Sequence, residues 1–365
     1  MNTIRLHRMW KRPAGWQRFR TAVSLHGHTM HSEESLDSLP RYVRRVPILA
    51  RAVRALPVDS SRAFWTPPLP ALNTLRSEQN QIEGKLGMAA LVSLTDHDNI
   101  QASTRLQLFA GTHRAPVSME WTVPLGVSFL HLGVHNLPRA GAHAWVRELQ
   151  AYTAQPSPEL LGQLLDGLNE MRGILIVLNH PLWDEPEVGT ALHQTMVHDF
   201  LRQHGHSIHA LELNGLRPWS ENRAVLQLAE ASGHVVVSGG DRHGSAPNTL
   251  LNLTDAASFD EFAAEIRQDR VSEILLTPQF RGSHLLRWIE CILDVVREYP
   301  ELAGRRHWSD RAFQRREDGS ILPLSACWGA DAGHFAAIMR LGQSRPLRSA
   351  LRVVLAVGQT GSLAW

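Results

Sequence analysis

Cysteine is scarce in this chain of 365 residues, which contains only Cys291 and Cys327. Two cysteines cannot build a disulfide framework or a zinc ribbon, so we expect a reducing compartment, by default the cytoplasm. Long apolar runs are missing too, since no stretch reaches the roughly 18 apolar residues of a membrane-spanning helix. The basic N-terminus has no apolar core of the kind that signal peptides need. We therefore expect no membrane association.

A surplus of charge is also absent, because 37 Lys and Arg residues face 35 Asp and Glu residues. This balance gives no electrostatic indication of nucleic acid as a partner, and no protein partner is evident. The Gly-x-Ser-x-Gly motif of serine hydrolases and the Gly-x-x-x-x-Gly-Lys motif of phosphate-binding loops do not occur. The sequence thus argues against a serine nucleophile and against P-loop chemistry.

Histidine is abundant, with 20 residues, and several histidines follow short apolar runs. A parallel strand delivers the residues at its C-terminal end to a shared site in this way. The runs and the residues that follow them are 21–25 before His26, 89–94 before Thr95-Asp96-His97, 117–119 before Glu120, 128–130 before His131, 174–178 before Asn179-His180, and 235–238 before Asp241. Two further runs, at 208–213 and 271–276, are also predicted strands.

Helical patterns lie between these runs, at 159–171 and 221–232, and Gly233 is placed to end the second helix. Alternation of this kind predicts βα units and a parallel sheet or barrel. Residues 40–88 interrupt the alternation as a long insertion after the first strand, which we interpret as a lid or a passive surface elaboration. Residues 281–365 form a tail with further helical pattern.

The polar motifs occur in a characteristic order. His-x-His-Thr, Thr-Asp-His-Asp, a Glu after a strand, His-Leu-Gly, Asn-His-Pro and Gly-x-Asp-x-His together resemble the PHP (polymerase and histidinol phosphatase) domain family over residues 20–280. The resemblance implies an α/β fold, a distorted (β/α)7 TIM-like barrel of PHP type, with a site for two or three metal ions at its C-terminal face. Residues 1–19 would be an N-terminal extension, and residues 281–365 a mainly helical C-terminal extension. It also implies phosphoesterase activity.

Carried over position by position, the resemblance implies a ligand set of imidazoles and carboxylates. The implied ligands are His26, His28, Glu120 and Asp241 for the first ion, Glu120, His131 and His180 for the second, and Glu33, His97 and His243 for the third. Glu34 stands beside Glu33, and His135 lies on the same face of an extended segment as His131, so these two choices stay open. Glu120 would bridge the first two ions.

Paired divalent ions lower the pKa of bound water from about 15.7 to around 7 and hold the attacking and leaving oxygens in line. Nitrogen-rich ligation suits Zn, Mn or Fe better than Mg. We therefore expect metal-bound hydroxide to attack a phosphate ester, with Glu120 and Asp241 at the catalytic centre. Arg242, or alternatively Arg217, is a candidate for donating hydrogen bonds to the phosphate group of the substrate. The expected substrate is a small phosphorylated metabolite, a nucleotide or a short nucleic acid.

Two other functions compete with phosphoesterase activity. One is a metal-stabilised binding or scaffolding module without turnover, and the other is metal-assisted hydrolysis of a carbon ester or amide. Every implied ligand position holds a competent residue, which favours an enzyme over a scaffold. The histidine-rich segment 193–209 has irregular spacing, so we expect no ligands there.

Overall fold

The chain divides into two units in the computed structural model, which describes residues 2–11, 15–37, 58–109, 111–112 and 115–327. The larger unit contains residues 1–31 and 69–284, and the smaller unit contains residues 32–68 and 285–365. The larger unit therefore includes the predicted N-terminal extension and also residues 69–88 of the predicted insertion. Residues 40–57 of that insertion and residues 328–365 of the tail lie outside the described residues.

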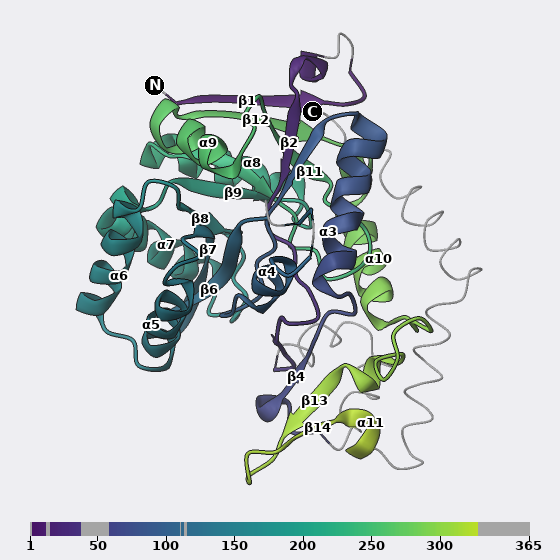
Figure 1. Cartoon of the computed structure of the whole chain (residues 1–365). Coiled ribbons are helices and arrows are strands. Elements are labelled where there is room, and N and C mark those ends of the chain that lie inside the picture. The colour runs from purple at the N-terminus through teal and green to yellow at the C-terminus, as the bar shows by residue number, and fades with distance from the viewer. Residues whose placement is uncertain (1, 12–14, 38–57, 110, 113–114, 328–365) are drawn as a thin grey trace. The chain divides into compact units, whose positions relative to one another are not determined.

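The first sheet of the larger unit has the strand order β1-β12-β11-β2-β5. Strand β1 pairs in parallel with β12, β11 is antiparallel to both β12 and β2, and β2 is parallel to β5 (Figure 1). The bounds are Thr3–Arg8 for β1, Thr21–Ser24 for β2, Ala89–Val92 for β5, Leu250–Thr254 for β11 and Val271–Leu276 for β12. The run at 271–276 is thus confirmed as a strand. Strand β2 is buried throughout and leads directly to His26.

The second sheet has the order β10-β9-β8-β7-β6. Strand β7 is antiparallel to both β6 and β8, whereas β8, β9 and β10 are parallel to one another. The bounds are Val117–Leu125 for β6, Ser128–Leu137 for β7, Leu175–Asn179 for β8, Ala210–Asn214 for β9 and Val235–Gly239 for β10. The runs at 117–119 and 128–130 are therefore only the starts of longer strands. Apolar and β-branched residues continue beyond Glu120, and Gly126, with φ of 60°, closes the hairpin in a two-residue turn that favours glycine.

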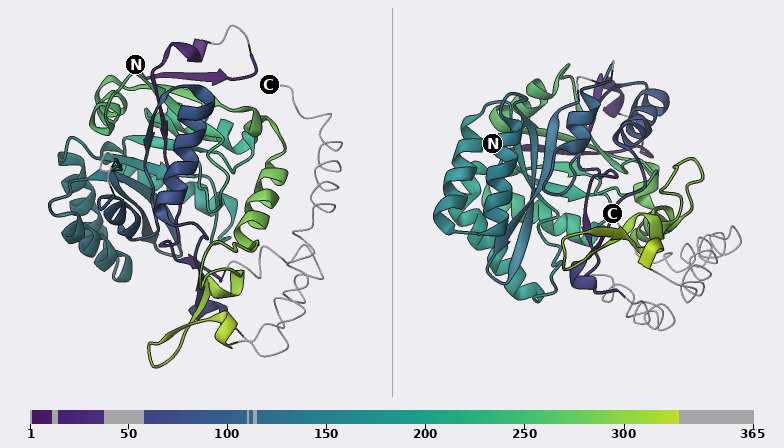
Figure 2. Two further views of the ribbon diagram at one scale, coloured as in Figure 1. Left: turned by 45° about the vertical axis from the view of Figure 1, so that its right-hand side comes forward. Right: turned by 60° about the horizontal axis from the view of Figure 1, so that its bottom comes forward.

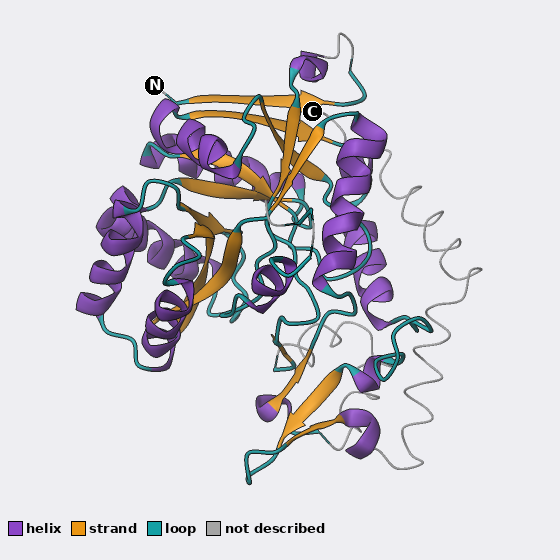
Figure 3. Cartoon of the chain, viewed as in Figure 1, coloured by secondary structure: helices purple, strands orange, loops and turns teal. Residues whose placement is uncertain are grey.

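Helices cover the second sheet on one side, where α5 packs against β6 and α6 lies beside α5 (Figure 3). The described helices of the larger unit are α3 (Ala71–Gln79), α4 (Gln101–Leu106), α5 (Ala142–Ala154), α6 (Pro158–Glu170), α7 (Thr190–His204), α8 (Trp219–Ser232) and α9 (Phe259–Ala264). Ser157 caps α6 through the Leu160 amide, and Gly233, with φ of 72°, ends α8 as predicted. None of the helices among the described residues is long and apolar enough to cross a membrane.

The predicted closed barrel is not confirmed. Among the described residues, the strands of the larger unit are hydrogen-bonded in two separate five-stranded sheets, and no closed ring of strands is found. The observed class is a mixed α/β fold. Strands β6 and β7 explain the difference from a strictly alternating βα pattern, because a tight hairpin joins them where a helix is expected.

The smaller unit contains a four-stranded sheet of order β14-β13-β4-β3. Its elements are β3 (Glu34–Ser35), β4 (Ala63–Trp65), α10 (His284–Val296, whose first residue belongs to the larger unit), β13 (Ala312–Arg315), β14 (Ile321–Pro323) and α11 (Leu324–Cys327). Arg311 is fully buried at its centre, where it donates hydrogen bonds to four backbone carbonyls, those of Val295, Arg297, Arg305 and Arg306. These carbonyls stabilise a buried guanidinium that would otherwise be costly.

Two basic side chains of the larger unit form hydrogen bonds with backbone carbonyls near the C-terminal ends of helices. Arg267 donates to the carbonyls of Asn169, Met171 and Ile174 around the end of α6. The His234 ring nitrogen Nε2 bonds the Gly205 carbonyl after α7. Such contacts satisfy carbonyls that a helix leaves without internal partners. Within the histidine-rich segment 193–209, His193 bonds the Pro181 carbonyl and His206 bonds Asp166.

His209 gives the larger unit a pH-dependent stability. Its Nδ1 accepts a hydrogen bond from the Ile176 amide and its Nε2 donates to Asn169, while burial, together with Arg267, lowers its pKa to about 3. A histidine that is neutral in the folded state stabilises fully above its unfolded pKa near 6.5, and this stability is lost as the pH falls towards 3.

We expect the unfolding free energy of the chain to fall between pH 7 and pH 5 by about 2 kcal/mol more than that of a His209→Gln variant. Urea unfolding of both proteins at the two pH values measures the difference. His198→Gln, at an exposed position of α7, is the control and should follow the parent protein. Equal pH dependence of the parent and the His209→Gln variant would contradict the assignment.

Candidate metal centre

Glu120 lies at the middle of the candidate site. The backbone of segment 96–98 pairs with the backbone of Glu120 in β6. The Glu120 amide donates to the Asp96 carbonyl at 3.1 Å, and the Asp98 amide donates to the Glu120 carbonyl at 2.8 Å. This pairing brings His97 beside Glu120. The Glu120 carboxylate is buried, and its Oε2 lies 3.1 Å from His26 Nε2, 3.3 Å from His28 Nε2 and 3.5 Å from His97 Nδ1.

The second oxygen of Glu120 faces a different pair of imidazoles. Its Oε1 lies 3.3 Å from His180 Nε2 and 3.6 Å from His131 Nδ1, and it also accepts a hydrogen bond from Asn179. Two donors bound to one ion at about 2.0–2.2 Å each are themselves separated by about 3–4 Å, which is the spacing found on both sides of Glu120. One carboxylate therefore joins two groups of nitrogen donors.

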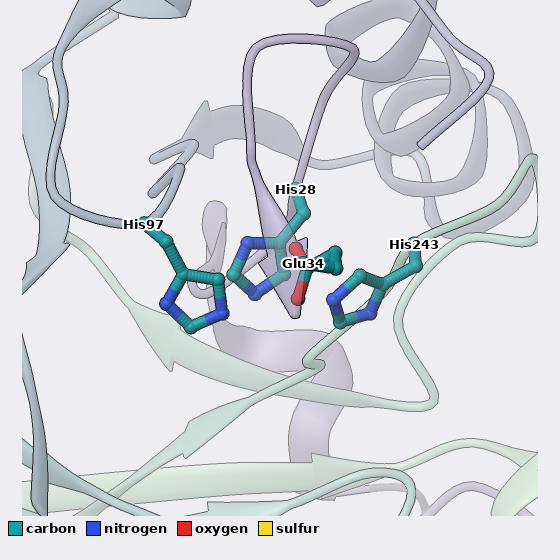
Figure 4. Close-up of side chains that lie close together, drawn as sticks. All are labelled: His28, Glu34, His97 and His243. Atoms are coloured by element: carbon teal, nitrogen blue, oxygen red, sulfur yellow. The ribbon is translucent and has the colours of Figure 1, made fainter. Parts of the chain in front are cut away.

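Asp241 and His243 complete the histidine cluster from the loop after β10. Asp241 Oδ1 lies 3.5 Å from His28 Nε2, 3.8 Å from His26 Nε2 and 3.7 Å from His243 Nδ1. Figure 4 shows the His28 ring between those of His97 and His243, with ring centroids 4.8 and 4.2 Å apart. The backbone bridge between Gly27 and Arg242 places this loop beside the segment that carries His26 and His28.

Two carboxylates orient this cluster from outside. Glu212, inside β9, accepts from His26 Nδ1 at 2.5 Å and from the His180 amide at 2.8 Å. Asp96 accepts from both the amide and the hydroxyl of Thr29, the residue after His28. A carboxylate on the second nitrogen of an imidazole fixes its tautomer and raises its basicity as a ligand. Glu212 therefore supports both His26 and His180.

Strained backbone is concentrated at the same place. Of the seven non-glycine residues with positive φ among the described residues, four lie in or beside the cluster, namely His26, Asp98, His180 and Asp241, with φ of 61°, 50°, 27° and 52°. Side chains other than glycine rarely adopt this region, which costs of order 1–3 kcal/mol each and is typical of functional sites. The strain turns the first residues after β2, β8 and β10 towards the common centre.

The pKa values in the cluster show how its charges are balanced. Burial raises the pKa of Glu120, but His26, His97 and His131 outweigh burial, so the pKa lies well below its usual range. Burial lowers the pKa of His26, yet Glu120 and Glu212 raise it well above the ordinary value. Burial, against the opposing charge of Glu120, lowers the pKa of His131 to about 3. His131 is therefore a neutral imidazole at physiological pH, the form that binds metal.

Other predicted residues have different surroundings. Glu33 belongs to the smaller unit, where its carboxylate pairs with Arg315. Glu34 belongs to that unit as well. His135 is buried and bonds Ser93 through Nδ1 at 2.8 Å, and among the described residues His131, not His135, belongs to a group of potential metal ligands.

Neither candidate arginine is an implied ligand, and the two have distinct settings. Arg242 is buried and its Nε donates to the Ala246 carbonyl within its own loop. Arg217, after β9, lies over Trp183 with its guanidinium carbon 3.9 Å from the ring centroid. Trp183 in turn contacts His180 edge to face, at 5.0 Å between centroids. Arg217 is thus near the edge of the cluster, whereas Arg242 has contacts inside the loop. That Arg242 donates hydrogen bonds to a substrate phosphate stays a prediction.

A scan against protein-family models gives no match, and neither does a search of curated proteins. Among solved structures the chain is similar to PsfC from Pseudomonas syringae PB-5123, with 15% identity, a TM-score of 0.41, and coverage of 71% of this chain and 93% of that one. An amidohydrolase from Chromobacterium violaceum, with bound sulfate and no metal, gives 15% identity, a TM-score of 0.35, and coverage of 62% and 89%. A candidate metal-dependent phosphoesterase from Bifidobacterium adolescentis gives 13% identity, a TM-score of 0.35, and coverage of 69% of this chain and 96% of that one. Likeness at this level decides neither a family nor an activity, so membership of the PHP family is not confirmed.

The donor set itself fits divalent metal ions. His26, His28 and Glu120 each offer an atom within 4.8 Å of the others, and so do His97, Glu120 and His131. Imidazole nitrogens with one shared carboxylate are the ligands of zinc, manganese and iron centres. Glu212, which holds the outer nitrogen of His26, and the strained strand ends supply the fixed geometry that such centres require. The cluster can therefore hold divalent metal ions.

Proposed function

We propose that the chain is a metal-dependent phosphoesterase with two or three divalent ions, Zn, Mn or Fe, held around Glu120. The observation that carries the proposal is the division of the Glu120 oxygens, one facing His26, His28 and His97 and the other facing His131 and His180. A carboxylate in this position suits two ions about 3.5–4 Å apart. Asp241, close to both His26 and His28, supports the first group of donors.

Divalent ions on these donors supply Lewis acidity, lower the pKa of water and neutralise charge on a phosphoryl group. The residues of the chain have three further tasks. Glu212 holds the His26 ring through Nδ1, so that Nε2 faces Glu120. The buried cluster excludes bulk water, which strengthens its electrostatic interactions. Arg217, held over Trp183 beside His180, places a cation near the edge of the cluster, where an anionic phosphate ester would approach.

The natural substrate is proposed at the level of class, as a small phosphorylated metabolite, a nucleotide or a short nucleic acid. A cationic Arg217 favours a phosphate over an uncharged carbon ester or amide, since a guanidinium binds phosphate oxygens in a bidentate manner. Arg217 is thus the residue on which the choice of a phosphoesterase over a carbonyl hydrolase depends.

We expect the purified protein to hydrolyse an aryl phosphate monoester or diester, to lose this activity on chelation, and to regain it when Mn²⁺ or Zn²⁺ is added. The reason is that the imidazoles and carboxylates of the cluster would serve as metal ligands, which leaves water activated by the ions as the nucleophile. Release of p-nitrophenol from p-nitrophenyl phosphate and from its diester measures the effect. Matched p-nitrophenyl acetate and anilide substrates measure carbonyl hydrolysis.

Arg217→Gln is the variant that separates the classes, and it should reduce phosphate-ester turnover at least tenfold while metal content stays unchanged. Hydrolysis of the acetate or anilide in preference to both phosphates would contradict the phosphoesterase assignment. Stoichiometric metal binding without turnover of any of these substrates would favour a scaffold.

A further inference from the structure

The loop between β10 and β11 carries two residues of the cluster although it has no regular secondary structure. Residues 240–249 contain Asp241 and His243. Backbone hydrogen bonds hold the first part, because the amides of Gly240 and Asp241 donate to Leu25 and His26. The remainder of the loop has to be held by other contacts if its two site residues are to keep one geometry.

Helix α3 supplies such contacts together with the π-helix that follows it, Asn80–Leu86. Ser77 donates to the Ser245 carbonyl at 2.8 Å, and Gln81 donates to the Asn248 carbonyl at 2.6 Å. Between them, Glu78 accepts from the Asn248 amide at 2.9 Å. Ser77 and Glu78 in α3 and Gln81 in the π-helix therefore reach the loop at three points. Figure 2 gives two further views of this helix, drawn in blue.

Glu78 and Asn248 also connect the helix to the strand that carries His26. Glu78 accepts from the Ser24 hydroxyl at 2.9 Å, and the Asn248 amide group donates to Ser24 and to the Leu25 carbonyl, both at 2.8 Å. All three side chains are buried. The Asn248 side chain lies directly against Gly240, where a Cβ would stand 1.2 Å from its Oδ1. The network therefore touches the residue that precedes Asp241 and the residues that precede His26.

Burial of Glu78 is unfavourable for stability at neutral pH. Burial raises its pKa to about 7, and a carboxyl group with a raised folded pKa lowers stability as the pH rises above its unfolded value. Apolar packing between α3 and the loop would avoid this cost. The Glu78 carboxylate is therefore not explained by the stability of the fold. It is explained by the hydrogen bonds that hold the 240–249 loop in place.

We propose that helix α3 is a clamp, acting through Glu78 and Asn248, that fixes the 240–249 loop and so positions Asp241 and His243 for metal binding. Glu78 is a positioning residue, because it touches neither the imidazoles nor the carboxylates of the cluster. The proposal rests on the proposed metal centre. It also gives residues 71–81 of the predicted insertion a role that differs from that of a lid.

Glu78→Ala tests the clamp in the full chain. We expect faster amide hydrogen exchange at residues 240–249 in the metal-free variant than in the parent protein. We also expect the Kd for Mn²⁺, measured by chelator competition, to rise about 10–100-fold, and the absorption bands of the Co²⁺-loaded protein to shift. Glu78→Gln keeps the length and one acceptor oxygen and should recover most of each effect. Glu83→Ala removes a carboxylate at an exposed position of the adjoining π-helix and should behave as the parent.

The outcomes separate the clamp from the metal centre itself. Unchanged exchange at 240–249 in Glu78→Ala would overturn the clamp, as would faster exchange with an unchanged Kd and unchanged Co²⁺ spectrum. Failure of the parent protein to bind Mn²⁺, Zn²⁺ or Co²⁺ would overturn the proposed function and the positioning role together, while the exchange data would still decide whether α3 holds the loop. A Glu78→Ala variant that does not fold is replaced by Asn248→Ala, for which the same results are expected.

Discussion

Replacing Glu120 with Gln should remove at least one equivalent of metal and lower phosphate-ester turnover by at least about 100-fold, beyond the losses typical of residues that only orient ligands. The physical reason is the shared position of the carboxylate, whose two oxygens face separate groups of imidazoles. A neutral amide offers one oxygen and no charge, so it cannot serve both groups. Elemental analysis and p-nitrophenyl phosphate hydrolysis measure the two effects.

The fold should survive this substitution, because Gln has the shape of Glu and can still accept the Asn179 hydrogen bond. Circular dichroism and thermal unfolding of the metal-free proteins check this point. Glu148→Gln, on the exposed side of α5, is the matched control and should leave metal content and turnover unchanged. Full metal content with parental turnover in the Glu120→Gln protein would remove Glu120 from the centre of the site.

The second large effect is expected from a single added methyl group. A Cβ at Gly239, at the end of β10, would stand 1.7 Å from Glu212 Oε1 and 2.9 Å from the His26 Cβ. Gly239→Ala therefore displaces the carboxylate that orients His26, and we expect metal affinity to fall about 10–100-fold with about 1–3 kcal/mol of destabilisation from overpacking. Chelator competition and urea unfolding measure these quantities.

Gly84→Ala is the matched control for this change. A Cβ at Gly84 meets no atom within 4 Å, and its φ is not in the left-handed region. Alanine there should leave metal affinity unchanged and stability equal or slightly higher. Parental metal affinity in Gly239→Ala would show that Glu212 does not need its present position to support His26.

Much of the larger unit is predictable because its strands are apolar and end abruptly. The predicted strands 174–178 and 235–238 agree with β8 and β10 within one residue at either end. The resemblance carried by the ordered polar motifs selects His26, His180 and Asp241, each of which follows an apolar strand. The structure brings these side chains together, although their role as metal ligands stays a proposal.

Strands with mixed or incomplete patterns were harder to predict. Strand β1 alternates apolar and basic residues and is only partly buried, so its sequence resembles a basic N-terminal extension. Glu120 and His131 lie inside β6 and β7 rather than after them, since the hairpin register depends on cross-strand pairing that a local pattern does not contain. Arg242 illustrates a further limit, because a local pattern does not give the partner of an arginine in an irregular loop, here the Ala246 carbonyl.

The antiparallel β6–β7 hairpin limits where residues can be inserted or deleted in this part of the chain. Trp121 points to helix α5, where its Nε1 donates to the Leu149 carbonyl, while the adjacent Glu120 points to the imidazoles. Side chains alternate along a strand, so inserting or deleting one residue between the bulge at Val117/Met119 and Glu120 would exchange these two faces. A large indole would then occupy the place of the central carboxylate. Length variation in this hairpin is therefore tolerable only beyond the paired residues, at the Gly126 turn, where neither face is affected.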